Sequence, residues 1–236
     1  MKKLILFMTL SFAAVLYGFA GDVAQYKDLG FSGDGARFVF AQYGVTDKTF
    51  QAWAEIYTVD IASNTFVKSA VFSVNPSNAT SGKSGISVFN ELYEKNKTVL
   101  SKYTEKPVSI DKVLFIRGNE AKKSDEIITF KDYEKIISEE DVYYSVQRVM
   151  YKEGSGVNTM SSFYIVLEKK DAENKVLQRQ VIGTPDYKRK GVTDYTIEKI
   201  WTDEKGKNIV ILVEKKVVDA NGTSIRYMIE AAPLVQ

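Results

Sequence analysis

Hydrophobic side chains recur along much of this chain in short runs that alternate with polar positions, a pattern typical of β-strands. The first three runs are rich in aromatic and β-branched residues and cover positions 38–43, 53–61 and 66–74. Turn-forming residues precede the first run at Gly33-Asp34-Gly35 and the third at Ser63-Asn64. The alternation therefore predicts a three-stranded antiparallel meander.

One segment follows the helical period instead of the strand period. From residue 86 onward, apolar side chains recur three or four positions apart, namely Val88, Phe89, Leu92, Tyr93, Val99 and Leu100. Ser84 or Ser87 is placed to cap the first turn, and Pro107 lies beyond the last one. We therefore predict one amphipathic helix near residues 86–103, packed on the face of a sheet.

Strand-like runs return beyond residue 108. They cover residues 113–116, 127–130, 143–151, 163–168, 176–182, 195–201, 209–213 and 225–229. The run 209–213 is apolar at every position, which predicts an interior strand buried on both faces. The fold class is therefore mainly β, either an antiparallel meander or sandwich or a partial propeller-like sheet, with the amphipathic helix packed on it.

The first twenty residues have the layout of a secretory signal peptide. Lys2 and Lys3 precede an uncharged, mostly apolar run from Leu4 to Leu16, and Gly18-Phe19-Ala20 supplies a small-x-small cleavage pattern. We expect cleavage after Ala20, an exported protein that is periplasmic or secreted, and a single mainly-β domain over residues 21–236. No later run reaches the ~20 apolar residues that span a bilayer, so no membrane anchor is expected after cleavage.

Composition excludes several chemistries. The chain has no histidine and no cysteine, which removes serine–histidine triads, thiol chemistry, disulfides and histidine-ligated zinc. The formal charge of +2 includes both lysines of the leader, so the remainder is balanced and no nucleic-acid partner is expected. We predict no catalytic residues, no cofactor and no metal.

A basic loop is the best candidate for ligand contact. Lys188, Arg189 and Lys190 lie together, with Tyr187 before them and Tyr195 after them. Pro185 restricts the backbone at Thr184 and gives the loop a defined entry. The five residues could bind an anionic group of a glycan or an envelope protein. The alternative is a solvated surface loop without a partner, because isolated surface charges contribute little.

Two functions follow from this chemistry. The first is a non-enzymatic envelope protein that binds a protein or glycan through a sheet edge or a loop surface. The second is a carboxylate-based hydrolase acting on envelope glycans, with Asp125-Glu126 and Glu139-Glu140-Asp141 as sources of a carboxyl pair. Side chains of adjacent residues point in different directions on strands and helices and do not converge as a carboxyl pair. A charged surface turn is therefore the simpler interpretation of those clusters.

Several segments occur in order over most of the chain and resemble an uncharacterised family of bacterial predicted secreted proteins, domain of unknown function 2259. They are Asp28–Gly35, Phe40–Gly44, Ala54–Ile61 and Ser224–Ala231. The resemblance implies export and carries no assigned activity or catalytic residue. A weaker local similarity relates Phe31–Phe40, and more loosely Trp201–Val210, to the propeller repeats of periplasmic TolB-like proteins.

Overall fold

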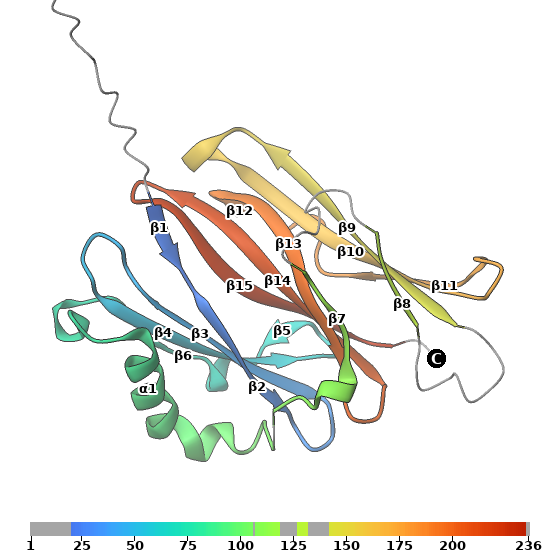
Figure 1. Cartoon of the computed structure of the whole chain (residues 1–236), viewed down its shortest axis with the longest axis horizontal. Helices are drawn as coiled ribbons and strands as arrows, with labels where there is room; N and C mark the ends of the chain where they lie inside the picture. The colour runs from blue at the N-terminus through green and yellow to red at the C-terminus, as the bar shows by residue number, and fades with distance from the viewer. Residues whose placement is uncertain (1–19, 106, 119–126, 132–141, 235–236) are drawn as a thin grey trace, which may run out of the picture.

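The computed structural model describes residues 20–105, 107–118, 127–131 and 142–234, and its strands form three sheets (Figure 1). The N-terminal sheet has the order β2-β3-β4-β5, with β6 also on β4. The central sheet has the order β1-β15-β14-β13-β7. The distal sheet has the order β11-β10-β9-β8, with β12 also on β10. Among the described strands, all pairings are antiparallel except that of β1 with β15.

Most strands contain a run seen in the sequence, but β14 and β15 extend beyond their runs, and the three strands at residues 20–23, 25–31 and 189–190 match none. The strands are β1 (Ala20–Val23), β2 (Gln25–Phe31), β3 (Arg37–Val45), β4 (Ala52–Asp60), β5 (Thr65–Phe66), β6 (Phe72–Val74), β7 (Val113–Ile116), β8 (Ile127–Lys131), β9 (Tyr143–Glu153), β10 (Met160–Lys170), β11 (Val176–Ile182), β12 (Arg189–Lys190), β13 (Val192–Thr202), β14 (Asn208–Asp219) and β15 (Gly222–Pro233). The mainly-β class with one packed helix is confirmed for the described residues.

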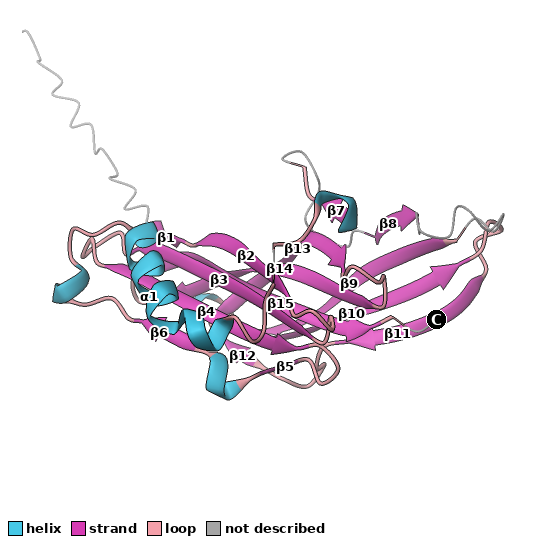
Figure 2. Ribbon diagram, turned by 90° about the horizontal axis from the view of Figure 1, so that it is seen from below, coloured by secondary structure: helices cyan, strands magenta, loops and turns pink. Residues whose placement is uncertain are grey.

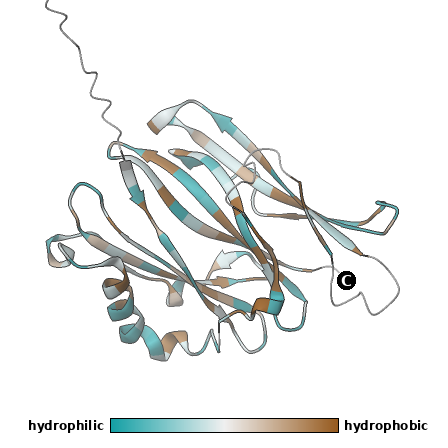
Figure 3. Cartoon of the chain, in the orientation of Figure 1, coloured by the Kyte–Doolittle hydropathy of each residue, from teal (hydrophilic) through white to brown (hydrophobic). Residues whose placement is uncertain are grey.

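The central sheet lies between the other two, and β14 shows why. Ile209, Ile211 and Val213 belong to the core shared with the distal sheet, whereas Val210 and Leu212 belong to the core shared with the N-terminal sheet. Successive side chains on a strand point to opposite faces, so a strand buried on both sides must be apolar throughout. The interior strand predicted at residues 209–213 is confirmed, and the hydropathy colouring of this layer is seen in Figure 3.

The helix α1 (Gly85–Leu100) covers the second face of the N-terminal sheet, lying over β3 and β4 (Figure 2). Ser84 is the N-cap, and its side chain accepts a hydrogen bond from the backbone N–H of Ser87 at 3.3 Å. The helix ends at Leu100, three residues before the predicted end, because residues 101–103 continue as a turn in which Tyr103 N–H donates to the Leu100 carbonyl.

The predicted meander is present with one difference. Strands β3 and β4 match the first two runs, and β2 extends the sheet by pairing with β3. The third run is split into β5 and β6 by a short 3-10 turn at Lys68–Ala70, which buries Ala70. The three sheets pack face to face through two shared cores, with the central sheet contributing to both.

The predicted leader lies outside the described residues except for Ala20, so its cleavage stays a prediction. In the ranges that the structure describes, no helix is long and apolar enough to cross a membrane.

Candidate functional site

The basic loop predicted from the sequence lies at one edge of the distal sheet. Its last two members, Arg189 and Lys190, form the short strand β12, which pairs with the start of β10. Tyr187 is the most exposed of the group, with 60% of its surface accessible. The loop is therefore ordered by sheet pairing rather than by Pro185 alone.

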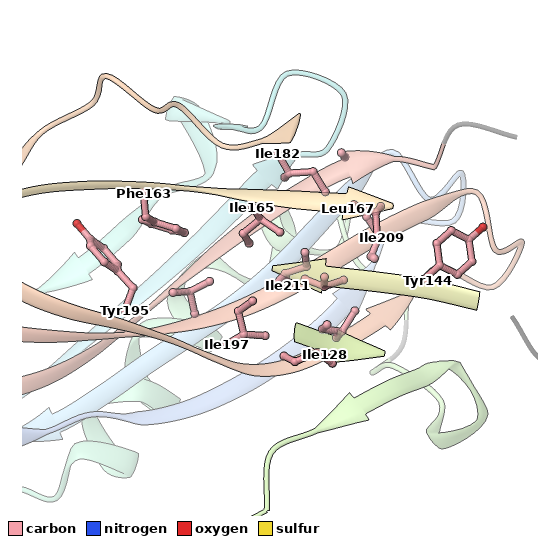
Figure 4. Packing of buried hydrophobic residues seen from close by; sticks show 14 of the residues in the cluster. Ile128, Tyr144, Phe163, Ile165, Leu167, Ile182, Tyr195, Ile197, Ile209 and Ile211 are labelled. Atoms are coloured by element: carbon pink, nitrogen blue, oxygen red, sulfur yellow. The ribbon is translucent and has the colours of Figure 1, made fainter. Parts of the chain in front are cut away.

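Tyr195 is separated from solvent. It is fully buried in the core between the distal and central sheets, where its ring lies 4.2 Å from that of Phe163, centroid to centroid (Figure 4). Its hydroxyl is 3.1 Å from the side-chain oxygen of Ser161. Tyr195 therefore supports the loop from below and presents no surface of its own to a ligand.

Arg189 turns inward rather than outward. Its guanidinium lies 4.7 Å from the ring centroid of Tyr187 and 5.8 Å from that of Tyr195, within cation–π range. A terminal nitrogen lies 3.9 Å from a carboxyl oxygen of Glu230 on β15. Burial raises the pKa of Glu230, while the hydrogen bond donated by the Asn64 amide and the charge of Arg189 oppose that rise. Arg189 thus joins the distal sheet to the central sheet.

Lys188 and Lys190 remain on the outer side of the distal sheet. The Lys188 ammonium lies 3.1 Å from a carboxyl oxygen of Glu153 at the end of β9. Lys190 is exposed and stands opposite Met160, which in turn stands opposite Glu153. Both lysines therefore border the face of the distal sheet that turns away from the central sheet.

We call this outward surface the open face. The inward positions of the distal sheet are occupied by core residues such as Phe163, Ile165 and Leu167. By strand alternation and register, the open face carries the other positions. Its members are Ile127, Thr129, Ser145, Gln147, Val149, Tyr151, Ser162, Tyr164, Val166, Glu168, Arg179 and Val181.

A pair of tyrosines dominates the open face. Tyr151 on β9 and Tyr164 on β10 have ring centroids 6.3 Å apart and ring planes tilted by 30°. Tyr151 is 57% exposed, and its hydrogen bond with Tyr164 raises the pKa of the Tyr164 phenol. The two rings form an aromatic surface with polar ends, which suits contact with a ligand that has both apolar and hydroxyl groups.

Charged residues border this surface at both ends. At one end are Glu153, Lys188 and Lys190. At the other, Glu168 lies 3.2 Å from the Lys170 ammonium and 3.8 Å from Arg179 Nε. The pair of Lys188 with Glu153 is exposed, so it contributes little to stability and remains accessible to a ligand. The side chains of Glu168 and Lys170 are only 21% and 19% exposed.

Sequence reasoning missed Tyr151 and Tyr164, although both lie in runs correctly predicted as strands. The available signal was their position within the alternation, because Tyr164 lies between the core positions Phe163 and Ile165. Pairing of β9 with β10, which brings the two rings together, joins positions thirteen residues apart and is not visible in either run alone. The structure keeps Lys188 and Lys190 beside these rings and removes Tyr195 from them.

Two further sequence features are placed as follows. The acidic groups Asp125-Glu126 and Glu139-Glu140-Asp141 lie outside the described residues. The turns within Phe31–Phe40 and Trp201–Val210 lie side by side in different sheets, where the Asn208 amide donates a hydrogen bond to the Gly35 carbonyl at 3.1 Å. They line a small depression together with Glu105 and Lys112. The two turns are thus neighbours across the interface between the N-terminal and central sheets.

Comparison with known proteins gives one finding. The family model described as Predicted secreted protein (DUF2259) matches residues 39–232, which is most of the chain and confirms the resemblance carried by its sequence segments. Neither the comparison with curated proteins nor that with solved structures gives a match.

Proposed function

Because the chain belongs to this family of predicted secreted proteins, we propose that it is exported to the periplasm or beyond and binds acidic glycans there without catalysis. The binding surface is the open face of the distal sheet. The observation that carries this proposal is the pair of rings formed by the exposed Tyr151 and the half-buried Tyr164, with Lys188 and Lys190 at the same end of the face.

The tyrosine rings supply the apolar part of the contact. A pyranose ring has a face of C–H groups that packs against an aromatic ring, while its hydroxyls bond to groups around the rim. Gln147, opposite Val166, places an amide group among the apolar side chains, whereas Ser162, directly opposite Tyr151, is buried. A tyrosine surface also loses little conformational freedom when it binds, because the side chain has few rotatable bonds.

The lysines supply the preference for acidic sugars. Lys188 is 52% exposed although it pairs with Glu153, and Lys190 is exposed beside it. A carboxylate or sulfate on the glycan would exchange places with Glu153 as the partner of Lys188. Each such contact is weak in water, so affinity depends on several sugar units and falls as salt is added.

A protein partner is the competing occupant of the open face, since exposed aromatic surfaces also mark protein interfaces. The glycan is favoured because charged and hydroxyl-bearing residues run through the face and the central valine is covered. Val166 is only 5% exposed, so a protein partner would find no apolar pocket there for an anchoring side chain.

The test is titration calorimetry of the purified mature protein with a set of soluble polysaccharides, acidic and neutral. We expect binding to acidic chains that weakens with salt, and loss of most of that binding in Tyr151→Ala and Tyr164→Ala. A double substitution of Lys188 and Lys190 by alanine should remove the preference for acidic over neutral chains.

The matched control replaces Lys95 and Lys97 by alanine. These lysines lie on the exposed side of α1, and Lys97 pairs with Glu94 at 3.3 Å much as Lys188 pairs with Glu153. Equal loss in both double variants would mean that net charge alone drives binding. No binding to any polysaccharide, together with saturable binding of an envelope protein that requires Tyr151, would assign the open face to a protein partner.

A further inference from the structure

Strand β11 is an edge strand whose only charged residue is Arg179. It pairs with β10 on one side, and within the described ranges its other side makes no backbone hydrogen bond. Its sequence from Val176 to Ile182 contains no lysine, proline or glycine. Val176, Leu177 and Val181 are each between 44% and 53% exposed. Exposed apolar edge strands of this kind readily pair with a further strand.

Some edge groups of the other two sheets are covered, on β15 and on β2. On β15, the Gln42 side chain accepts from the Tyr227 N–H at 2.8 Å, and the Asn64 side chain accepts from the Ala231 N–H at 2.9 Å. On β2, the Phe31 carbonyl accepts from the N–H of Glu105 at 3.1 Å. Side chains or loops thus satisfy edge groups on the central and N-terminal sheets.

The residues of β11 read almost the same in both directions. Around Arg179 stand Gln178 and Gln180, then Leu177 and Val181, then Val176 and Ile182. In an antiparallel pairing of this strand with itself, centred on Arg179, glutamine faces glutamine and each aliphatic residue faces another aliphatic residue. Such a pairing obeys two-fold symmetry automatically, which is the commonest arrangement of homodimers.

We infer that β11 is a self-association edge, and that two copies of this chain join through antiparallel β11–β11 pairing into one continuous sheet. The register of β11 with β10 shifts only at the hairpin end, between Lys169 and Lys170, so Gln178 to Ile182 remains regular and available. The new strand pair would cover Leu177 and Val181 and satisfy the free edge of each copy.

Arg179 is the one charged residue of the strand, and the two copies would bring both arginines together at the symmetry axis. Like charges directly opposite are destabilising. Each arginine, however, has Glu168 beside it on β10, with Nε 3.8 Å from a carboxyl oxygen. The row across four strands then reads glutamate, arginine, arginine, glutamate and is neutral overall. The arginine pair keeps association weak and reversible, and added salt should strengthen it.

The dimer has a consequence for the open face. Two strands of one continuous sheet are related by an axis perpendicular to that sheet, so both copies present their open faces on the same side. Two tyrosine surfaces on one side could engage one extended polymer, which raises apparent affinity without any new contact. The self-association itself does not depend on the proposed glycan function.

A cysteine experiment tests the register, because the natural chain has no cysteine. In Arg179→Cys, the two introduced residues would face each other at a Cα separation of about 4.5–5.5 Å, within the range of a disulfide. In the control Val181→Cys, the two cysteines would lie roughly 13 Å apart along the strand and would not cross-link. Under mild oxidation we expect a disulfide dimer for the first variant only. Equal cross-linking of both variants would contradict the pairing.

Sedimentation of the unmodified full chain over a concentration series gives the second test. We expect a reversible dimer that Arg179→Thr strengthens and Val181→Lys weakens by about tenfold or more, since the new lysine would face Leu177 of the second copy. The matched control is Ile127→Lys on β8, the opposite edge of the same sheet, where 56% exposure compares with 53% at Val181. A monomer at every concentration, or a larger effect of Ile127→Lys, would overturn the proposal, whether or not glycans bind.

Discussion

The N-terminal and distal sheets both pack one face against the central sheet, but their second faces differ. The second face of the N-terminal sheet carries the ring of Tyr43 and a set of aliphatic residues without charges, and α1 lies on it. The aliphatic residues are Val39, Ala41, Ala52, Ala54 and Ile56. The second face of the distal sheet carries tyrosines, amides and charges, and its Tyr151, Val181 and Ile127 are more than half exposed. Side-chain polarity therefore decides which face accepts a helix.

The close approach of α1 shows how strict this requirement is. A β-carbon at Gly85 would lie 2.9 Å from backbone atoms of Gly44 on β3. Such a contact is possible only because neither residue has a side chain. On the open face, a helix would have to bury Glu168 and Arg179 and part both tyrosine rings. The side chains of the open face therefore suit contact with solvent or a ligand better than contact with a packed helix.

The largest expected effect comes from breaking the covered face. Phe89→Ala removes a ring that is 2% exposed and stacks 5.3 Å from Tyr43. We expect a loss of about 3–5 kcal/mol in the free energy of unfolding, because a cavity remains between helix and sheet. Urea denaturation measures it. Ile86→Ala, at a 40% exposed position of the same helix, should cost far less. Similar losses at both positions would show that α1 is not tightly packed.

A smaller effect is expected where helix and sheet backbones meet. Gly85→Ala places a methyl group against Gly44, so the first turn of α1 must shift. We expect destabilisation of about 1–3 kcal/mol, as for overpacked cores, even though alanine favours helices. Asn90→Ala, at an exposed position of the same helix, should be neutral or slightly stabilising. A stabilised Gly85→Ala protein would contradict this close approach.

The burial of Lys215 between the central and distal sheets can be tested by the pH dependence of stability. Lys215 lies on the side of β14 that faces the distal sheet, opposite Tyr195 in the register. Burial lowers the pKa of Lys215 to about 8, and the nearby charge of Arg189 adds to this. The unfolded chain therefore holds more protons between pH 8 and the usual value of 10.5, so the contribution of Lys215 to stability rises with pH across that window.

Replacing Lys215 by methionine should remove this rise, a difference of about 1–3 kcal/mol between the two ends of the window. Urea unfolding of variant and parent at both ends measures it. The exposed neighbour Lys216→Met serves as the control and should keep the rise of the parent. If the free energy of unfolding rises with pH no more steeply in the parent than in Lys215→Met, solvent reaches Lys215 freely.

The smallest effect on stability is expected on the open face. Tyr151→Ala changes a residue that is 57% exposed, so the free energy of unfolding should change by about 0.5 kcal/mol or less. Polysaccharide binding, in contrast, should be largely lost. A loss of stability comparable to that of Phe89→Ala would show that Tyr151 is part of a packed interface. It would contradict the division into a face covered by α1 and an open face.

The local pattern of apolar and polar residues predicted most of the strands and the helix. The period-two runs placed the strands, and the three-to-four spacing after Ser84 placed α1 and its cap. The continuous apolar run at residues 209–213 identified the middle strand, since only a strand buried on both sides needs apolar residues at every position. The split of the third run at Lys68–Ala70 was not visible, because both halves have strand-like composition.

The candidate site was predicted only in part. A cluster of charges in the sequence singled out the segment around residues 187–190, but the sequence could not tell which side chains point outward. Lys188 and Lys190 border the open face, whereas Arg189 reaches Glu230 and Tyr195 enters the core. Tyr151 and Tyr164 could be recognised as one aromatic surface only from the pairing of β9 with β10, which brings their rings together.

The sequence by itself therefore determined the secondary structure, the family and the excluded chemistries, because each depends on residue type or short-range spacing. The tertiary structure decided which faces are covered, which edges are free and which distant residues meet. These depend on sheet stacking and strand register, in which contacts join residues far apart in the chain. The open face and the β11 edge belong to this second group. Each is recognised only when the described structure shows that no further strand or helix packs against it.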